Sequence, residues 1–253
     1  MSTSPQPRLE GRTIVVTGAA SGIGAAIARG VAAAGATVAC VDVDGDGAAA
    51  TARALPAASH HALDLTDFSA VERLGENLRA QHGRVHGLVT AAGGSRGEAR
   101  PFLEMDPQTW HHMIDRNLTS TFHTALVIAR MMAADGGGSI VLVSSQLSVV
   151  VRPGLAHYSA SKGAINQLVR GMAVDLGSHG IRVNAVAPGP TITPGNAAWF
   201  SRPDVEQFHA ELIPLGRPAD PDEMWGGAVH LLSDESSFTT GAVLMIDGGY
   251  TLT

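Results

Sequence analysis

The sequence predicts one α/β domain, and three observations support this prediction. Short apolar runs rich in β-branched residues, typical of strands buried on both faces, alternate with segments of helical periodicity. Glycine-punctuated segments of this kind run evenly through all 253 residues, so we expect a single domain over residues 1–253 rather than two. With 45% apolar and 16% charged residues, the chain can also bury a large core.

Composition and charge argue against several classes of protein. A net charge of −6 and a pI near 6, with no basic run, disfavour a surface for nucleic acid or for an anionic membrane. Residues 1–10 are expected to form a flexible tail that lacks the apolar stretch of a signal peptide, and no apolar run is long enough to span a membrane. The single cysteine, Cys40, lies in an apolar run and cannot form a disulfide within the chain. We therefore expect a cytoplasmic protein.

The first expected strand and helix enclose a glycine turn. The strand is Thr13–Thr17, and the helix carries Ile23, Ile27 and Val31 on one face. The glycines between them, Gly18, Gly22 and Gly24, permit positive φ and let a pyrophosphate approach the free N–H groups of the helix N-terminus. A glycine cluster alone also fits an ordinary tight turn.

A second buried strand supports the dinucleotide interpretation of this turn. The run 37–41 ends at Asp42, eighteen residues beyond Gly24, where a carboxylate can meet the ribose of a bound dinucleotide. Asp42 could instead cap a helix or a turn, since Asp44 and Gly45 follow it closely.

The alternation of strands and helices continues through the middle of the chain. We expect helices over 45–55 and 67–82, strands over 60–63 and 85–92, and a helix from Asp106 or Pro107 to Met132. This last helix is expected to bend near Asn117, whose amide competes for backbone partners, although spacing alone also allows an exposed asparagine.

The next strand and helix carry residues that can transfer a proton. The strand 139–143 delivers Ser144 and Ser145 at its carboxyl end, where two serines also fit a simple turn. The following helix places Tyr158 and Lys162 one turn apart on one face. An unperturbed phenol titrates at about 10, and a neighbouring ammonium is expected to lower that pKa toward the range of a general acid or base. Taken alone, such a pair is more often an ordinary surface pair.

Two more strands complete the expected sheet. The strand 181–187 is broken by Pro188, Gly189 and Pro190, and the apolar run Val243–Ile246 lies near the C-terminus.

Together these motifs resemble the short-chain dehydrogenase/reductase family, over nearly the whole chain from Gly11 to Tyr250. The matching segments are Thr17-Gly18-x-x-x-Gly22-Ile23-Gly24, Asp64, Ala91-Ala92-Gly93, Asn117, Ser145, Tyr158-x-x-x-Lys162, Pro188-Gly189-x-x-x-Thr193 and the closing residues 240–250. The resemblance implies a Rossmann-like, doubly wound parallel sheet of seven strands with helices on both faces.

The resemblance also implies roles for four catalytic residues. Ser145 lies thirteen residues before Tyr158, the usual spacing in the family, so Ser145 rather than Ser144 would hold the substrate oxygen. Tyr158 would transfer the proton. Lys162 would lower the pKa of Tyr158 and bind the nicotinamide ribose, and Asn117 would position a water next to Lys162.

The implied cofactor is NAD. Asp42 would bind both adenine-ribose hydroxyls and repel a 2′-phosphate, and Ser21 stands where NADP-preferring relatives often carry a cation. The cofactor-binding residues are expected to be Gly18, Ser21, Gly22, Ile23, Gly24, Asp42, Asp64, Leu65, Ala91, Ala92, Gly93, Tyr158, Lys162, Pro188, Gly189, Thr191 and Thr193.

Two positions depart from the family pattern, and neither is catalytic. Thr90 replaces an asparagine that is mainly structural, which puts local sheet bonding in doubt. Thr191 stands where an aliphatic residue is commoner, but the backbone supplies the expected contact. The eleven histidines show no metal-ligand spacing, so we expect them to be exposed to solvent and we expect no catalytic metal.

The favoured function is NAD-dependent interconversion of a secondary alcohol and a ketone. The alternatives are a 3-oxoacyl-[acyl-carrier-protein] reductase and a non-catalytic protein that senses a dinucleotide. Residues 194–214 are expected to form the substrate loop or lid, with Trp199 and Phe200 against the substrate, unless its aromatic residues only dock a short helix. Because Arg202 is the only basic residue of this segment besides His209, an uncharged alicyclic or aryl substrate is favoured. Relatives form tetramers, so we expect a homotetramer.

Overall fold

The structure is a computed structural model that describes residues 8–95 and 97–253. The expected tail falls partly on residues 1–7, which lie outside the described residues. Its last part was assigned wrongly, because Leu9 is fully buried and its N–H donates to the carbonyl of Ala34.

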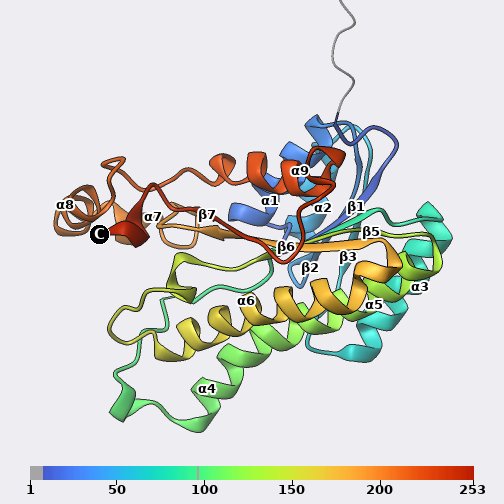
Figure 1. The fold of residues 1–253 in the computed structure, drawn as a ribbon. Helices are drawn as coiled ribbons and strands as arrows, with labels where there is room; N and C mark the ends of the chain where they lie inside the picture. The colour runs from blue at the N-terminus through green and yellow to red at the C-terminus, as the bar shows by residue number, and fades with distance from the viewer. Residues whose placement is uncertain (1–7, 96) are drawn as a thin grey trace, which may run out of the picture.

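A seven-stranded parallel sheet forms the centre of the molecule (Figure 1). The strand order is β3-β2-β1-β4-β5-β6-β7, which confirms the predicted doubly wound topology. The strands are β1 (Thr13–Thr17), β2 (Thr37–Asp42), β3 (Ala58–Ala62), β4 (Gly87–Thr90), β5 (Gly138–Val143), β6 (Ile181–Pro188) and β7 (Val243–Ile246). The chain order reverses between β1 and β4, and in such sheets the reversal opens a crevice at the carboxyl ends of the strands.

Helices cover both faces of the sheet (Figure 1). On one face, α1 (Gly22–Ala33), α2 (Gly45–Arg53) and α9 (Trp225–Leu232) contribute to a core that includes Ile27, Ala52 and Val229. On the other, α3 (Phe68–His82), α5 (Ser120–Ala134) and α6 (Ala156–Leu176) contribute to a second core. The strands between these cores are buried on both faces, as their continuous apolar runs predict.

The bend expected near Asn117 is a π-helical turn. Helix α4 (Pro107–Ile114) passes through this turn, Asp115–Thr119, directly into α5. The wider turn admits the amide of Asn117, which is fully buried and donates to the carbonyl of Met113 at 3.0 Å. The alternative of an exposed asparagine is therefore wrong.

Two expected boundaries were wrong and one loop is partly helical. Strand β3 lies at Ala58–Ala62 rather than 60–63, because this edge strand is positioned by pairing with β2 and has little apolar pattern of its own. Strand β4 is shorter than the apolar run 85–92. Residues 194–214 contain two short helices, α7 (Ala197–Phe200) and α8 (Pro203–Leu212). Within the described residues, no helix is long and apolar enough to cross a membrane.

Candidate active site

The glycine turn after β1 is shaped by contacts that leave no space for side chains. Gly18 has φ +71° and a Cβ there would lie 2.6 Å from the backbone of Ala91, while a Cβ on Gly24 would overlap the carbonyl of Gly18. Gly22 has φ +56°, and its Cβ would lie 3.2 Å from the methyl group of Thr193. Bare backbone thus faces the segment that follows β6. The N-terminus of α1 opens here, with Ser21 exposed and no side chain capping it.

Asp42 ends β2 beside this turn, and its carboxylate binds two backbone groups. One oxygen accepts from the N–H of Ala20 and the other from the N–H of Asp44, each at 3.0 Å. The turn role considered for Asp42 is therefore present. Each oxygen retains a lone pair for a further donor, so ribose binding is compatible with these bonds.

Asp64 and Leu65 follow β3 on the same edge. The Asp64 carboxylate is exposed and accepts two bonds at 2.8 Å from the backbone and hydroxyl of Thr66. The Leu65 side chain is buried, and its carbonyl lies 3.1 Å from a ring nitrogen of His123.

The end of β4 is joined to the π-helical turn. Gly93 has φ +126°, and a Cβ there would lie 2.6 Å from Oδ1 of Asn117. That oxygen accepts from the N–H of Gly94 at 2.8 Å. Ala91 and Ala92 bond back to the carbonyl and hydroxyl of Thr17, respectively. The small residues that follow β4 therefore leave space above them, and Asn117 fixes their backbone.

The segment after β6 forms the opposite wall of the crevice. A Cβ on Gly189 would lie 2.5 Å from Cα of Asp247, so this glycine is required by packing. Thr191 is buried and its hydroxyl donates to the carbonyl of Gly189 at 3.0 Å. The N–H of Thr193 donates to Asn196 at 2.7 Å, which sets this segment against the glycine turn. The expected cofactor residues thus lie at or just after the carboxyl ends of β1, β2, β3, β4 and β6, at the start of α1 and in α6.

Ser145, Tyr158 and Lys162 meet at the carboxyl end of β5. The Ser145 side chain neighbours the Tyr158 phenol and lowers its pKa, while its own hydroxyl donates to Gln146 at 2.9 Å and accepts from the N–H of Leu147 at 3.1 Å. Lys162 is 4% exposed, and its ammonium donates to the carbonyl of Val143 at 2.9 Å and lies 5.8 Å from the centre of the Tyr158 ring. Ser144 instead donates to the side chain of Asn166 at 2.6 Å, and this bond joins the end of β5 to α6.

The net pKa shift of Tyr158 is opposite in direction to the one expected from Lys162 alone, because burial dominates it. Burial raises the pKa of the Tyr158 phenol, and the neighbouring Ser145 side chain only partly opposes that effect. Burial also lowers the pKa of Lys162 to about 8, because a low-dielectric surrounding penalises its charged form. The sequence showed the pair but not the depth at which it lies.

The short helices α7 and α8 form an aromatic cluster around one buried histidine. The rings of Trp199, Phe200 and Phe208 lie 5.4, 4.9 and 5.3 Å from the ring of His209. Phe200 is 8% exposed and therefore supports the cluster, whereas Trp199 keeps 40% of its surface exposed. Of the two predicted substrate contacts, Trp199 is thus the one with a free face. The expectation of exposed histidines is wrong for His209 and His157, which are fully buried.

Sequence reasoning missed Arg152, which lies in the segment between Ser145 and Tyr158 and connects that segment to the aromatic cluster. Its guanidinium lies 4.8 Å from the centre of the Phe208 ring. Its Nη1 lies 3.4 Å from Nε2 of His209. A hollow of about 400 Å³ beside this segment is lined by Arg100, Phe102, Val151, Arg152, Pro153, Gly154 and Ala156. No sequence motif marks Arg152.

The departure at Thr90 has a visible consequence. Its buried hydroxyl has no hydrogen-bond partner among the described residues, so threonine does not replace the bonding that an asparagine amide could supply. Among residues 8–95 and 97–253, no group of three or more His, Cys, Asp or Glu side chains could hold a metal ion.

Known proteins match this chain over nearly its whole length. A family model described as Enoyl-(Acyl carrier protein) reductase matches residues 18–251. The chain is 43% identical over 244 residues to cis-4-hydroxycyclohexanecarboxylate dehydrogenase from Sinomonas cyclohexanicum, covering 95% of this chain and 96% of that relative.

Two solved structures show the same fold. A gluconate 5-dehydrogenase from Burkholderia cenocepacia in complex with NADP and tartrate matches with a TM-score of 0.92 at 34% identity, over 98% of each chain. A 7α-hydroxysteroid dehydrogenase complexed with NADH and 7-oxo glycochenodeoxycholic acid matches with a TM-score of 0.91 at 32% identity, again over 98% of each chain.

Proposed function

The chain belongs to the short-chain dehydrogenase/reductase family of oxidoreductases that act on alcohols and ketones, and from that premise we propose an NAD-dependent dehydrogenase of cyclic secondary alcohols. The observation that carries the proposal is that the side chains of Ser145 and Tyr158 lie together beside the buried Lys162, at the carboxyl ends of the strands. A protein that only senses a dinucleotide has no need of this pair.

The residues of the chain can move the proton that such a reaction requires. A nicotinamide held by residues 188–193 would supply the hydride acceptor for oxidation of the carbinol carbon and the hydride donor for reduction of the ketone carbon. Tyr158 donates its hydroxyl proton to the ketone oxygen in reduction, and its phenolate takes the alcohol proton in oxidation. The raised pKa keeps Tyr158 protonated at neutral pH, which is the state that reduction needs. Ser145 holds the same substrate oxygen by a second hydrogen bond.

The crevice fits a dinucleotide. The bare backbone of Gly22 at the start of α1 faces Thr193, and a side chain at Gly22 would fill the space between them, whereas side chains at Gly18 and Gly24 would overlap backbone atoms of Ala91 and Gly18. We assign the pyrophosphate to this glycine turn, the adenine ribose to Asp42 and the nicotinamide to the wall formed by residues 188–193. Asp42 would repel a 2′-phosphate, and Val43 beyond it offers no cation, so NAD is preferred over NADP.

The proposed substrate class rests on the exposed apolar side chains of the segment 194–214 and of the hollow beside Arg152. Trp199 offers an apolar face, and Phe102 and Val151 line the neighbouring hollow with 74% and 79% of their surfaces exposed. An alicyclic ring suits these surfaces, as does the ring substrate in the name of the Sinomonas cyclohexanicum relative.

Within that class, Arg152 favours a ring that carries a carboxylate. The segment 194–214 by itself supports an uncharged substrate, because Arg202 is paired with Asp204. The fold, however, brings Arg152 from another segment to α8, where a guanidinium can bind a carboxylate. Arg152→Gln should therefore raise KM for a hydroxycycloalkane carboxylate and leave KM for the uncharged cycloalkanol nearly unchanged.

The direct test follows the absorbance of the reduced nicotinamide with a panel of cyclic alcohols and ketones, plus a 3-oxoacyl thioester. Tyr158→Phe should lower kcat by about 100-fold or more while the Kd for NAD stays within a few-fold of wild type. Tyr250→Phe, which alters the only other tyrosine of the chain, is the matched control and should retain turnover. Substantial kcat in Tyr158→Phe would contradict the assignment, and preference for the thioester would favour the acyl-carrier reductase.

The cofactor preference has its own test. Asp42→Ala should reduce the ratio of kcat/KM for NAD over NADP by about tenfold or more, because a repelling charge and two ribose bonds are lost. Asp46→Ala, an exposed carboxylate in the first turn of α2, serves as the control. An unchanged ratio in Asp42→Ala would remove the basis for NAD preference.

We also propose that the protein is a cytoplasmic homotetramer. The apolar side chains of Phe122 on α5, Val174 on α6 and Leu244 on β7 are 45%, 82% and 39% exposed. Burying such surfaces between copies would stabilise an oligomer. Light scattering that gave a mass of 26.0 kDa at micromolar concentration would rule out the assembly.

A further inference from the structure

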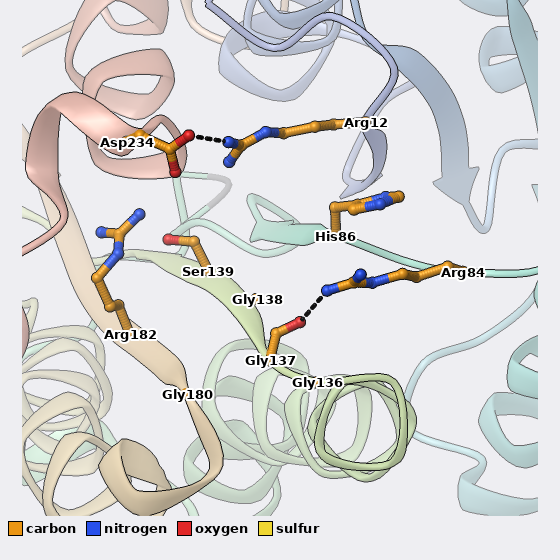
Figure 2. Close-up of a pocket in the computed structure, with 10 residues that line it drawn as sticks. All are labelled: Arg12, Arg84, His86, Gly136, Gly137, Gly138, Ser139, Gly180, Arg182 and Asp234. Carbon is orange, nitrogen blue, oxygen red and sulfur yellow. Dashed lines mark hydrogen bonds and ion pairs between the residues drawn. The ribbon is translucent and has the colours of Figure 1, made fainter.

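A polar hollow lies at the amino-terminal ends of the strands, on the side of the sheet opposite to the candidate active site. Figure 2 shows this hollow, which we call the amino-edge hollow; it has a volume of about 340 Å³. It is lined by Arg12, Arg84, His86, Gly136, Gly137, Gly138, Ser139, Gly180, Arg182 and Asp234. Arg12, His86 and Arg182 precede or begin β1, β4 and β6, so the hollow is separated from Tyr158 by about 20 Å, the length of a six-residue strand.

The lining of the amino-edge hollow is strongly cationic. Three guanidinium groups face one carboxylate, Asp234, which gives a net charge of +2 with His86 neutral. The chain as a whole carries −6, so this concentration of positive charge runs against the overall balance. Like charges gathered in a partly enclosed space repel one another, and a bound anion would relieve that repulsion.

The three arginines differ in how many donors they have left. Arg182 is committed to the fold, since it donates to Leu231, Ser233 and Ser236 at 2.8 to 3.0 Å. Arg12 donates to the carbonyl of Leu232 and is paired with Asp234.

Arg84 is the guanidinium with the most donors to spare. A single bond of 3.3 Å to the carbonyl of Gly137 is its hydrogen bond within the described residues, out of the five N–H groups that a guanidinium carries.

His86 adds a neutral donor between two of these cations. Its Nδ1 accepts from the backbone N–H of Thr13 at 3.0 Å, so the proton of the neutral ring is on Nε2. Figure 2 shows the ring between Arg12 and Arg84. Burial lowers the pKa of His86, and the charges of Arg84 and Arg12 lower it further, with Asp135 opposing them. The pKa of the His86 ring therefore depends on the positive charge that surrounds it in the hollow.

We propose that the amino-edge hollow binds a small multivalent oxyanion, the phosphate or polycarboxylate group of a soluble metabolite, through Arg84, Arg12 and His86. Several oxygens on one centre can accept from these three side chains together, which a halide cannot do. The hollow is also much larger than the roughly 30 Å³ that one water occupies, so it accommodates more than a bare ion. Arg182 contributes charge and fixes one wall.

This site is independent of the dehydrogenase reaction. None of its residues lines the crevice at the carboxyl edge, and its occupation does not require NAD. An anion bound there would stabilise the fold, because it joins segments that precede β1, β4 and β6.

The experiment titrates the protein with inorganic phosphate, citrate and chloride at matched ionic strength, with excess NAD present to occupy the glycine turn. Calorimetry should show millimolar or tighter binding of phosphate or citrate and none of chloride. Arg84→Gln should weaken that binding by about tenfold. Arg84→Lys keeps the charge but loses the paired N–H donors of the guanidinium, and it should weaken the binding less. Arg53→Gln, an exposed arginine at the end of α2, is the matched control and should bind as wild type does.

A second readout excludes a merely structural role for Arg84. The NMR titration of the His86 ring should show a higher pKa when the anion is bound, and therefore tighter anion binding as the pH falls. Tighter binding of phosphate would identify phosphorylated metabolites, and tighter binding of citrate would identify polycarboxylates. The proposal fails if neither anion binds, if chloride competes equally, or if Arg84→Gln binds with wild-type affinity.

Discussion

The burial of Lys162 predicts that a catalytic residue destabilises its own protein. A decrease of the Lys162 pKa from 10.5 to about 8 corresponds to about 3 kcal/mol of unfavourable free energy, at about 1.4 kcal/mol per pKa unit. This penalty acts below pH 8, where the lysine is charged in both the folded and the unfolded states. Lys162→Met keeps a similar shape without the charge, but it leaves the carbonyl of Val143 without its donor, which costs about 1 to 2 kcal/mol. When NAD is absent, Lys162→Met should therefore be about 1 to 2 kcal/mol more stable than wild type at pH 7, and it should be inactive.

The pH dependence gives the sharper measurement. Because the folded-state pKa of Lys162 is the lower one, the unfolded state binds more protons between about 8 and 10.5, and wild-type stability should rise with pH in that window. Urea unfolding at several pH values should show wild type gaining about 3 kcal/mol relative to Lys162→Met. Both proteins should carry Tyr158→Phe, so that the neighbouring phenol does not titrate in the same range.

A direct titration serves as the control. Lys162 is the only lysine of the chain, so its side-chain NMR signal needs no assignment among competitors. If the stability difference between the two proteins does not change from pH 8 to pH 10.5, or if the lysine titrates near its ordinary pKa, the inferred burial penalty is wrong.

Three further predictions concern other sites. Thr90→Val should be neutral or stabilise the fold by about 1 kcal/mol in urea unfolding, because it removes a buried hydroxyl that has no partner; a clear loss of stability would reveal a bond to that hydroxyl. Gly24→Ala should lower Tm by several degrees and weaken NAD binding, because its methyl group would overlap the Gly18 carbonyl, and a wild-type Kd for NAD would contradict that contact. Burial and Arg152 lower the pKa of His209, so its contribution to stability is present above about pH 6.5 and is lost as the pH falls through its folded-state pKa; His209→Gln should flatten this decline in Tm, and an unchanged slope would contradict it.

The sequence predicted the parts of the site that depend on neighbours in the chain. The glycine turn and the shared helix face of Tyr158 and Lys162 follow from local spacing, and the bend was expected from the amide of Asn117; the structure contains each of them. The spacing of Ser145 and Tyr158 was informative because a known family shares it.

The parts that the sequence did not predict depend on contacts between distant segments. Nothing near Arg152 in the chain indicates that it reaches Phe208, and nothing near His209 indicates burial among three aromatic rings. The direction of the Tyr158 pKa was missed for the same reason, since it depends on how much chain covers the phenol. Long-range packing decides all three.

The π-helical turn at Asp115–Thr119 has a consequence for which insertions and deletions the gene can tolerate. One residue more or fewer in that turn would convert it to a different helical pitch and rotate α4 relative to α5 by about 100°. Asn117 would then leave Gly94 and Met113, and the backbone that follows β4 would lose its support. Insertions and deletions between β4 and β5 should therefore be tolerated in the exposed stretch before Asp106 and not in the π-helical turn. A library of single-codon deletions under selection for activity would show this difference.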